Sequence, residues 1–155
     1  MAEFITAATE EDYREARALL REYEAEIEVD LCFQGFEEEL VTLRRVYGPP
    51  GGVFFLLRQE GRIAGCVALK DLGGGVCEMK RLFLRPGFRG GGLGRRCAER
   101  IVQTAREMGY AAMRLDTLPA MHAAIALYRS MGFRQIAQYT ENPLEGALFM
   151  ELRLR

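Results

Sequence analysis

KRLFLRPGFRGGGLGR, residues 80–95, is the most informative stretch of the chain. An apolar segment ends there at a Pro-Gly pair, and Arg89 and three consecutive glycines lead into a long amphipathic segment. Glycines at the start of a helix leave backbone N–H groups unshielded, and these groups bind phosphate well together with the positive end of the helix dipole. Arg89 and Arg95 can add charge-assisted hydrogen bonds on either side. The stretch predicts a strand, a turn and a helix whose N-terminus binds a diphosphate.

Two common phosphate-binding motifs do not fit these glycines. A P-loop requires a lysine directly after its last glycine, and none follows here. A dinucleotide-binding fingerprint requires a further glycine, but the residue three positions after Gly94 is Cys97. Both motifs are excluded.

The spacing Arg89-x-x-Gly92-x-Gly94 resembles a signature of the GNAT superfamily of N-acetyltransferases, which has arginine or glutamine first and glycine or alanine last. A strand precedes the pattern and a helix follows it, and the downstream segment LYRSMGF, residues 127–133, is similar to the second signature of the superfamily. The resemblance is close over residues 78–133 and holds in outline on both sides. It implies an α/β (α+β) fold of the GNAT type, a mixed and mostly antiparallel sheet flanked by helices, with acetyl-CoA as the co-substrate.

Hydrophobic periodicity predicts the order βααβββαβαββ in a single domain, residues 1–155. Expected strands cover residues 3–7, 53–58, 63–70, 76–84, 113–117, 133–137 and 148–154, and expected helices cover 10–26, about 36–46, 93–108 and 121–131. Thr9 is expected to cap the first helix, with Asp12 three residues later. In the central strand 76–84, even-numbered positions are expected to face one side of the sheet and odd-numbered positions the other, which puts charges on both faces.

The composition is that of an ordinary globular domain. Hydrophobic residues make up 49% and charged residues 28% of 155 residues, and a formal net charge of −1 gives no general attraction to nucleic acid or to an anionic membrane. No apolar run approaches the roughly 20 residues of a membrane span, and the N-terminus lacks the features of a signal peptide. A cytoplasmic protein without nucleic-acid or membrane partners is therefore expected.

No metal site is expected. The four cysteines are widely spaced and form no C-x-x-C pair, and the chain has one histidine. The cysteines are interpreted as reduced, mostly buried small hydrophobic residues.

The resemblance implies a cofactor site in two parts. Main-chain groups of Leu82, Phe83 and Leu84 would pair with the pantetheine arm of acetyl-CoA, in a gap between neighbouring strands. The loop and helix start, with Arg89, Gly90, Gly91, Gly92, Leu93, Gly94 and Arg95, would bind the diphosphate. The alternative is a glycine-rich turn without a ligand. Members of the family often have an asparagine at the position of Met121, so one cofactor contact is in doubt.

Two residues are candidate catalytic groups by the same resemblance. Tyr128 matches the tyrosine that protonates the departing CoA thiolate, because a phenol and a thiolate have comparable basicity; its alternative role is packing. Glu78 matches a glutamate that deprotonates the amine; its alternative role is an ion pair with Lys80 or with an arginine on a neighbouring strand. His122, the single histidine, is interpreted as an exposed residue at a helix start, with a role as a base as the alternative.

The same resemblance implies that the acceptor enters opposite the cofactor, between the first two helices and the loop that joins the last two strands. Phe33, Tyr139 and Asn142 are the residues predicted to bind it, among further candidates Tyr23, Glu26, Asp30, Gln34 and Glu141. The predicted acceptor is the primary amine of a small molecule. Two alternatives stay open, a CoA-binding sensor without turnover and an acetyltransferase that acts on proteins or peptides. GNAT domains commonly dimerise through terminal strands, and residues 147–152 are a candidate apolar edge for a homodimer.

Overall fold

The computed structural model describes residues 2–27 and 35–155. Within these residues, seven strands form one sheet in the order β1-β2-β3-β4-β5-β7-β6, and only β4 and β5 pair in parallel. The strands are β1 (Ala2–Thr6), β2 (Val53–Gln59), β3 (Arg62–Gly73), β4 (Val76–Leu84), β5 (Ala112–Thr117), β6 (Arg134–Ile136) and β7 (Leu148–Arg153). The helices are α1 (Glu10–Ile27), α2 (Phe36–Val41), α3 (Leu43–Tyr47), α4 (Leu93–Glu107) and α5 (His122–Ser130), with a short 3₁₀ turn at Pro86–Phe88. The expected mixed, mostly antiparallel sheet flanked by helices is confirmed.

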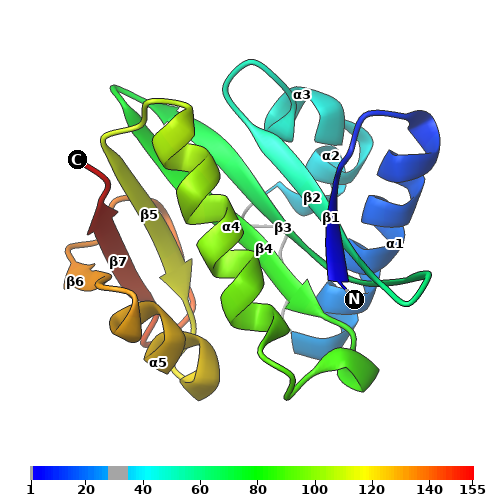
Figure 1. The fold of residues 1–155 in the computed structure, drawn as a ribbon. Coiled ribbons are helices and arrows are strands. Elements are labelled where there is room, and N and C mark those ends of the chain that lie inside the picture. Colours follow the sequence, from blue (N-terminus) through cyan, green and yellow to red (C-terminus); the bar gives the residue numbers. More distant parts are fainter. Residues whose placement is uncertain (1, 28–34) are drawn as a thin grey trace.

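The helices cover the two faces of the sheet unequally (Figure 1). On one face, α4 and α5 pack on the central strands and on β7. On the other face, α1, α2 and α3 pack on the half of the sheet that contains β2 and β3. The buried stripe of α4 consists of Leu93, Cys97, Ala98, Ile101, Val102 and Ala105. Met108 was expected to continue this stripe, but it lies at the helix C-cap and is 37% exposed.

The expected second helix is divided at Thr42. This residue leaves the helical region, with φ −122° and ψ 27°, and its hydroxyl donates a hydrogen bond of 2.7 Å to the carbonyl of Glu38. A threonine hydroxyl that bonds to the preceding turn competes with the backbone ladder. The first helix begins as predicted, because Thr9 Oγ1 accepts from the Asp12 amide at 3.1 Å and Asp12 accepts from the Thr9 amide at 3.1 Å.

Strand β4 contains a β-bulge at Arg81. Cys66 of β3 pairs with Phe83, whereas Ala68 pairs with Lys80, so β4 uses one more residue than β3 over this interval. Arg81 has a φ of 61°, in the left-handed region that a side chain rarely occupies. An extra residue of this kind bends the strand and re-aims the side chains that follow it.

The bulge makes the expected alternation along β4 wrong beyond Lys80. Leu82 and Leu84 pack against the same cluster as Cys77 and Met79, on the α4 face. Phe83 belongs to the cluster on the α1 face. Even-numbered positions before the bulge therefore share a face with odd-numbered positions after it.

The side chain of Arg81 is buried beneath α2 as one member of a charged pair. Its Nε and Nη2 donate to Glu39 at 2.9 and 2.8 Å, and Tyr47 donates to the same carboxylate at 2.8 Å. The rings of Phe36 and Tyr23 lie 5.2 and 5.9 Å from the guanidinium carbon. Burial raises the pKa of Glu39, but the hydrogen bonds and charge of Arg81 outweigh burial and leave it lowered.

Strand β7 is not an edge strand. It pairs with β5 on one side and with β6 on the other, so the expectation that residues 147–152 form an exposed apolar edge is wrong. The three-residue strand β6 closes this end of the sheet. The candidate homodimer thus loses the exposed strand on which it depended.

The sheet opens between its two parallel strands. β4 and β5 pair at three positions only, Val76–Glu78 with Ala112–Arg114. Beyond them, β4 continues to Leu84 against β3, and β5 continues to Thr117 against β7. This is the separation of strands that the resemblance implies.

Candidate active site

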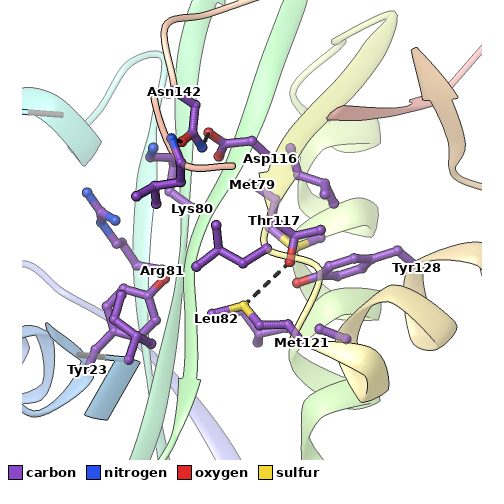
Figure 2. A pocket seen from close by; sticks show the side chains of 15 residues that line it. Tyr23, Met79, Lys80, Arg81, Leu82, Asp116, Thr117, Met121, Tyr128 and Asn142 are labelled. Carbon is purple, nitrogen blue, oxygen red and sulfur yellow. Dashed lines mark hydrogen bonds between the residues drawn. The ribbon is translucent and has the colours of Figure 1, made fainter. Parts of the chain in front are cut away.

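A cavity of about 110 Å³ lies where β4 and β5 separate. Figure 2 shows that its side chains come from several elements: Lys80 and Leu82 from β4, Asp116 from β5, Tyr128 from α5 and Asn142 from the loop before β7. This convergence follows from the sheet order, because β4, β5 and the start of α5 meet where pairing between the strands stops. A small molecule or an extended arm can enter here without breaking a strand pair.

A wider groove of about 630 Å³ continues from this cavity toward the glycine loop. It is lined by all three residues predicted to pair with pantetheine, Leu82, Phe83 and Leu84, and by Arg89 and Gly94 of the predicted diphosphate site. The groove therefore connects the two parts of the predicted cofactor site.

The glycine loop fits a diphosphate. Gly90 and Gly92 have φ values of 87° and 81°, and Gly92 is the N-cap of α4. A Cβ atom added at Gly90, Gly91 or Gly92 would meet no atom within 4 Å, so the backbone is open to a ligand on this side. Leu93 begins the helix with its side chain in the core, so only its main chain is available to the site.

The two predicted phosphate-binding arginines have different partners. Arg89 donates to both carboxylate oxygens of Glu26 on α1, at 2.6 and 2.5 Å, and to the carbonyl of Leu84 at 2.9 Å. Arg95 donates to the hydroxyl of Ser130 on α5 at 2.5 Å and lies 3.7 Å from Glu99. Arg89 thus lies in the groove, whereas the side chain of Arg95 is directed toward α5.

Tyr128 lies at the inner end of the cavity. Its ring is 7% exposed and packs against Phe133 with centroids 5.7 Å apart, while its hydroxyl points into the cavity toward Thr117 (Figure 2). Burial raises the pKa of Tyr128. The phenol is therefore protonated at neutral pH, as a proton donor must be.

Glu78 lies in a second, polar cavity of about 460 Å³. Its Oε2 accepts a hydrogen bond of 2.6 Å from Tyr139, and its Oε1 lies 3.9 Å from the ammonium of Lys80. Burial, and then the charge of Glu78, raise the pKa of Tyr139. Glu78 does not line the cavity that holds Tyr128, but Lys80 and Asp116 line both cavities and join them.

Asp116 is the residue of this site that sequence reasoning missed. It accepts a hydrogen bond of 3.1 Å from the amide of Asn142, whose oxygen in turn accepts from the Leu144 backbone at 3.0 Å. Its only sequence signal is an acidic residue at the end of an apolar strand, which is too common to be diagnostic. Tyr139 and Asn142, two of the residues predicted to bind the acceptor amine, thus donate hydrogen bonds to the carboxylates of Glu78 and Asp116.

The remaining candidates are less informative. Phe33, Asp30, Gln34 and Cys32 lie outside the described residues. His122 is exposed at the first position of α5 and lines the groove. Met121 accepts a hydrogen bond of 3.5 Å from Thr117 through its sulfur, at the position where the family often has asparagine. Over the described residues there is no metal-ligand cluster, and no helix is long and apolar enough to cross a membrane.

Comparison with known proteins identifies the family. Residues 5–133 match the acetyltransferase (GNAT) family model. An uncharacterized N-acetyltransferase of Schizosaccharomyces pombe is 40% identical over 146 residues, which cover 93% of this chain and 90% of that protein. An IAA acetyltransferase of Azospirillum brasilense is 42% identical over 102 residues, 63% of this chain and 65% of that protein.

Solved structures show the same fold. A GNAT-family acetyltransferase of Staphylococcus aureus has a TM-score of 0.82 at 20% identity, with all of both chains covered. A Salmonella typhimurium protein solved with its cofactor acetyl-CoA has a TM-score of 0.72 at 20% identity, covering 100% of this chain and 95% of that one. By its sequence match over residues 5–133 and its close relative in Schizosaccharomyces pombe, the chain belongs to the acetyltransferase (GNAT) family.

Proposed function

We propose that the protein transfers the acetyl group of acetyl-CoA to the primary amine of a small molecule. The observation that carries the proposal is the separation of β4 and β5, which opens a cavity holding the Tyr128 hydroxyl beside a groove that reaches the glycine loop. An acyl thioester with a long arm and a diphosphate has the dimensions of such a connected site. Family membership supports the reaction class.

The chain's own residues would hold the co-substrate in three places. Backbone amides of Gly90 to Gly94 and the guanidinium of Arg89 would bind the diphosphate. The main chain of β4 from Leu82 to Leu84, which has no strand partner on the β5 side, would pair with the amides of the arm. When bound, acetyl-CoA supplies an acyl group already activated as a thioester.

Two proton transfers complete the reaction. Glu78 accepts the proton that the amine loses as its nitrogen forms the new bond to the acetyl carbon. Tyr128 donates its phenolic proton to the sulfur as the carbon–sulfur bond breaks, so that CoA leaves as a neutral thiol. A positioned acid or base of this kind contributes typically about 10²–10⁴-fold in rate.

Asp116 is a second candidate for the base. It lines the cavity with Tyr128 as well as the polar cavity with Glu78, so its carboxylate lies at the junction that the amine must pass. Substitutions Glu78→Gln and Asp116→Asn distinguish the two. The variant that lacks the base is expected to lose rate most below the pKa of the amine, where little free amine exists.

Calorimetry with acetyl-CoA, followed by an amine panel with a free-thiol assay, tests the proposal. A dissociation constant in the micromolar range and amine-dependent release of CoA are expected. Absence of binding at millimolar acetyl-CoA would overturn the proposal. Binding without thiol release above background would instead support a sensor, and activity on peptides alone would support a protein-directed enzyme.

A further inference from the structure

A row of alternating charges crosses the sheet beneath the polar cavity. Lys70 of β3 pairs in register with Glu78 of β4, Glu78 pairs with Arg114 of β5, and Arg114 pairs with Glu151 of β7. Directly paired positions place their side chains on the same face. We call these four residues the charge row. It lies on the face opposite α4, since Met113 and Leu152, the neighbours of Arg114 and Glu151 along their strands, point into the α4 core.

The polar cavity is built on this row. Its lining includes Lys70, Glu78 and Arg114 from the row, Lys80 and Asp116 one step further along the strands, and Tyr139 to Glu141 from the loop before β7. Three cationic and three acidic side chains therefore surround one cavity of about 460 Å³.

The acidic and cationic side chains of the polar cavity differ in whether they have a hydrogen-bond or ion-pair partner. Glu78 accepts from Tyr139 at 2.6 Å, Asp116 accepts from Asn142 at 3.1 Å, and Arg114 donates from Nε to Glu151 at 2.8 Å. Lys70 is half-buried, yet among the described residues it forms neither an ion pair nor a side-chain hydrogen bond. A ligand with a negative group would supply the partner that Lys70 lacks.

The positions of the two lysines agree with a ligand that carries a negative group. The chain has 21 lysines and arginines together, and the two lysines, Lys70 and Lys80, both line the polar cavity. Lysine is a compact, strongly hydrated point charge on a flexible stem, whereas arginine presents a planar fork.

We propose, on the basis of the acetyltransferase function above, that the acceptor is an amino acid, an amine that also carries a carboxylate. Its amine lies at the junction of the two cavities, beside Asp116, the second candidate for the base, where the acetyl group would be presented. Its carboxylate lies in the polar cavity, where Lys70 supplies its ionic partner. Lys70 thereby favours amines that carry a carboxylate over amines that do not.

Matched acceptors test the selection. Each L-amino acid is compared with its carboxamide, which keeps the amine and the side chain and removes the negative charge. We expect kcat/KM for the preferred amino acid to exceed that of its carboxamide by at least about tenfold, as for loss of a charge-assisted hydrogen bond. Equal rates on amino acid and carboxamide would overturn the inference and leave the acetyltransferase function standing.

Lys70→Gln tests the residue. It is expected to raise KM for the amino acid about three- to tenfold with little change in kcat, and to leave the carboxamide unaffected. Lys70→Arg restores the charge and should recover most of the affinity. Arg14→Gln removes the same charge from an exposed position on α1, outside the cavity, and should change neither constant.

A binding measurement separates failure of this inference from failure of the proposed function. Calorimetric titration of the CoA-saturated protein with amino acid and with carboxamide requires no turnover. Preference for the amino acid that Lys70→Gln removes supports the inference even if no acetyl transfer is found. Absence of any preference overturns it, and absence of CoA binding overturns the proposed function.

Discussion

Arg81 combines two unfavourable features, a left-handed backbone and a buried charge. Its backbone is left-handed, which costs about 1–2 kcal/mol for a residue with a side chain. Its side chain is 3% exposed, and its charge would be unstable there without the Glu39 side chain, which is 8% exposed and binds it through two hydrogen bonds. Because the bulge re-aims Leu82 and Phe83, this buried pair holds the part of β4 that lines the groove.

Removal of the acid from this pair should be strongly destabilising. Glu39→Gln leaves a buried, unpaired guanidinium, and we expect the free energy of unfolding to fall by about 3–5 kcal/mol in chemical denaturation. Glu38→Gln, on the exposed neighbour, is the control and should have little effect. If the double variant Glu39→Leu, Arg81→Met is as unstable as Glu39→Gln, the unpaired charge is not the cause.

The same pair predicts an acid dependence of stability. The net pKa of Glu39 is lowered in the folded protein, so its contribution is complete above the pKa of the unfolded chain and is lost as pH falls through the folded value. The wild-type protein should therefore lose more stability than Glu39→Gln when the pH is lowered through the ordinary glutamate range. Parallel pH profiles of unfolding for the two proteins would contradict this.

Tyr128→Phe isolates the proposed proton donor. The substitution keeps the ring against Phe133 and removes only the hydroxyl, so folding and acetyl-CoA binding should persist while kcat falls about 10²–10⁴-fold. Tyr13→Phe removes a buried hydroxyl that donates to Ala7, on the α1 side of the sheet, and should leave kcat unchanged. Steady-state kinetics within about threefold of wild type would assign Tyr128 to packing.

For helices and strands, local sequence patterns predict the end of an element correctly wherever a cap or a turn residue sets it. The turn after β2, the N-cap at Thr9 and the glycine stop after α4 are all where the sequence predicts them. Three features depend on distant contacts and could not be read from the chain: the break at Thr42, the bulge at Arg81 and the interior place of β7. Alternation of residues cannot report a bulge, because the extra residue is defined only by its pairing with β3.

The placement of the candidate site residues was predictable to a similar extent. Leu82, Arg89 and Gly94 belong to a linear motif, and the structure brings them into one groove. Asp116, Lys70 and Arg114 belong to no motif, because cross-strand register alone makes them neighbours of Glu78 or of the cavity.

Two glycines of the α4 entrance should respond differently to alanine. Gly92 has a φ of 81°, so Gly92→Ala should lower the free energy of unfolding by about 1–2 kcal/mol and distort the loop. Gly94 is helical, and an added Cβ would meet only Leu84 Cδ1 at 3.8 Å, an ordinary contact. The free energy of unfolding of Gly94→Ala should therefore lie within about 0.5 kcal/mol of the wild-type value. Thermal and chemical unfolding of both variants test this, and equal losses would refute the conformational argument.

At the scale of the molecule, helix α1 is tied to the entrance of the cofactor groove by two ion pairs one turn apart. Glu26 binds Arg89 at 2.6 and 2.5 Å, and Glu22 binds Arg85 at 3.0 and 2.8 Å. Only the first pair engages an arginine of the phosphate-binding motif. The hydrogen bonds from Arg89 lower the pKa of Glu26, so its carboxylate is charged at neutral pH and, under the proposed function, would compete with the diphosphate for the same guanidinium.

Glu26→Gln should therefore strengthen acetyl-CoA binding. An exposed ion pair is worth little, so we expect a decrease in the dissociation constant of about two- to fivefold, measured by calorimetry at low salt and smaller at high salt. Glu22→Gln removes the equivalent charge one turn earlier, beside Arg85, and should leave the constant nearly unchanged. A weaker binding constant for Glu26→Gln would show that Glu26 orients Arg89 for the ligand.

The presence of both lysines in the lining of the polar cavity also makes the protein easy to observe. Reductive methylation with isotope-labelled formaldehyde modifies amines only, so beyond the α-amino group every NMR-visible methyl signal would come from Lys70 or Lys80. Burial lowers the pKa of Lys80, against the opposing charge of Glu78, so the methyl signal of this lysine should titrate at lower pH than that of a free lysine. The polar cavity thus contains its own spectroscopic reporters.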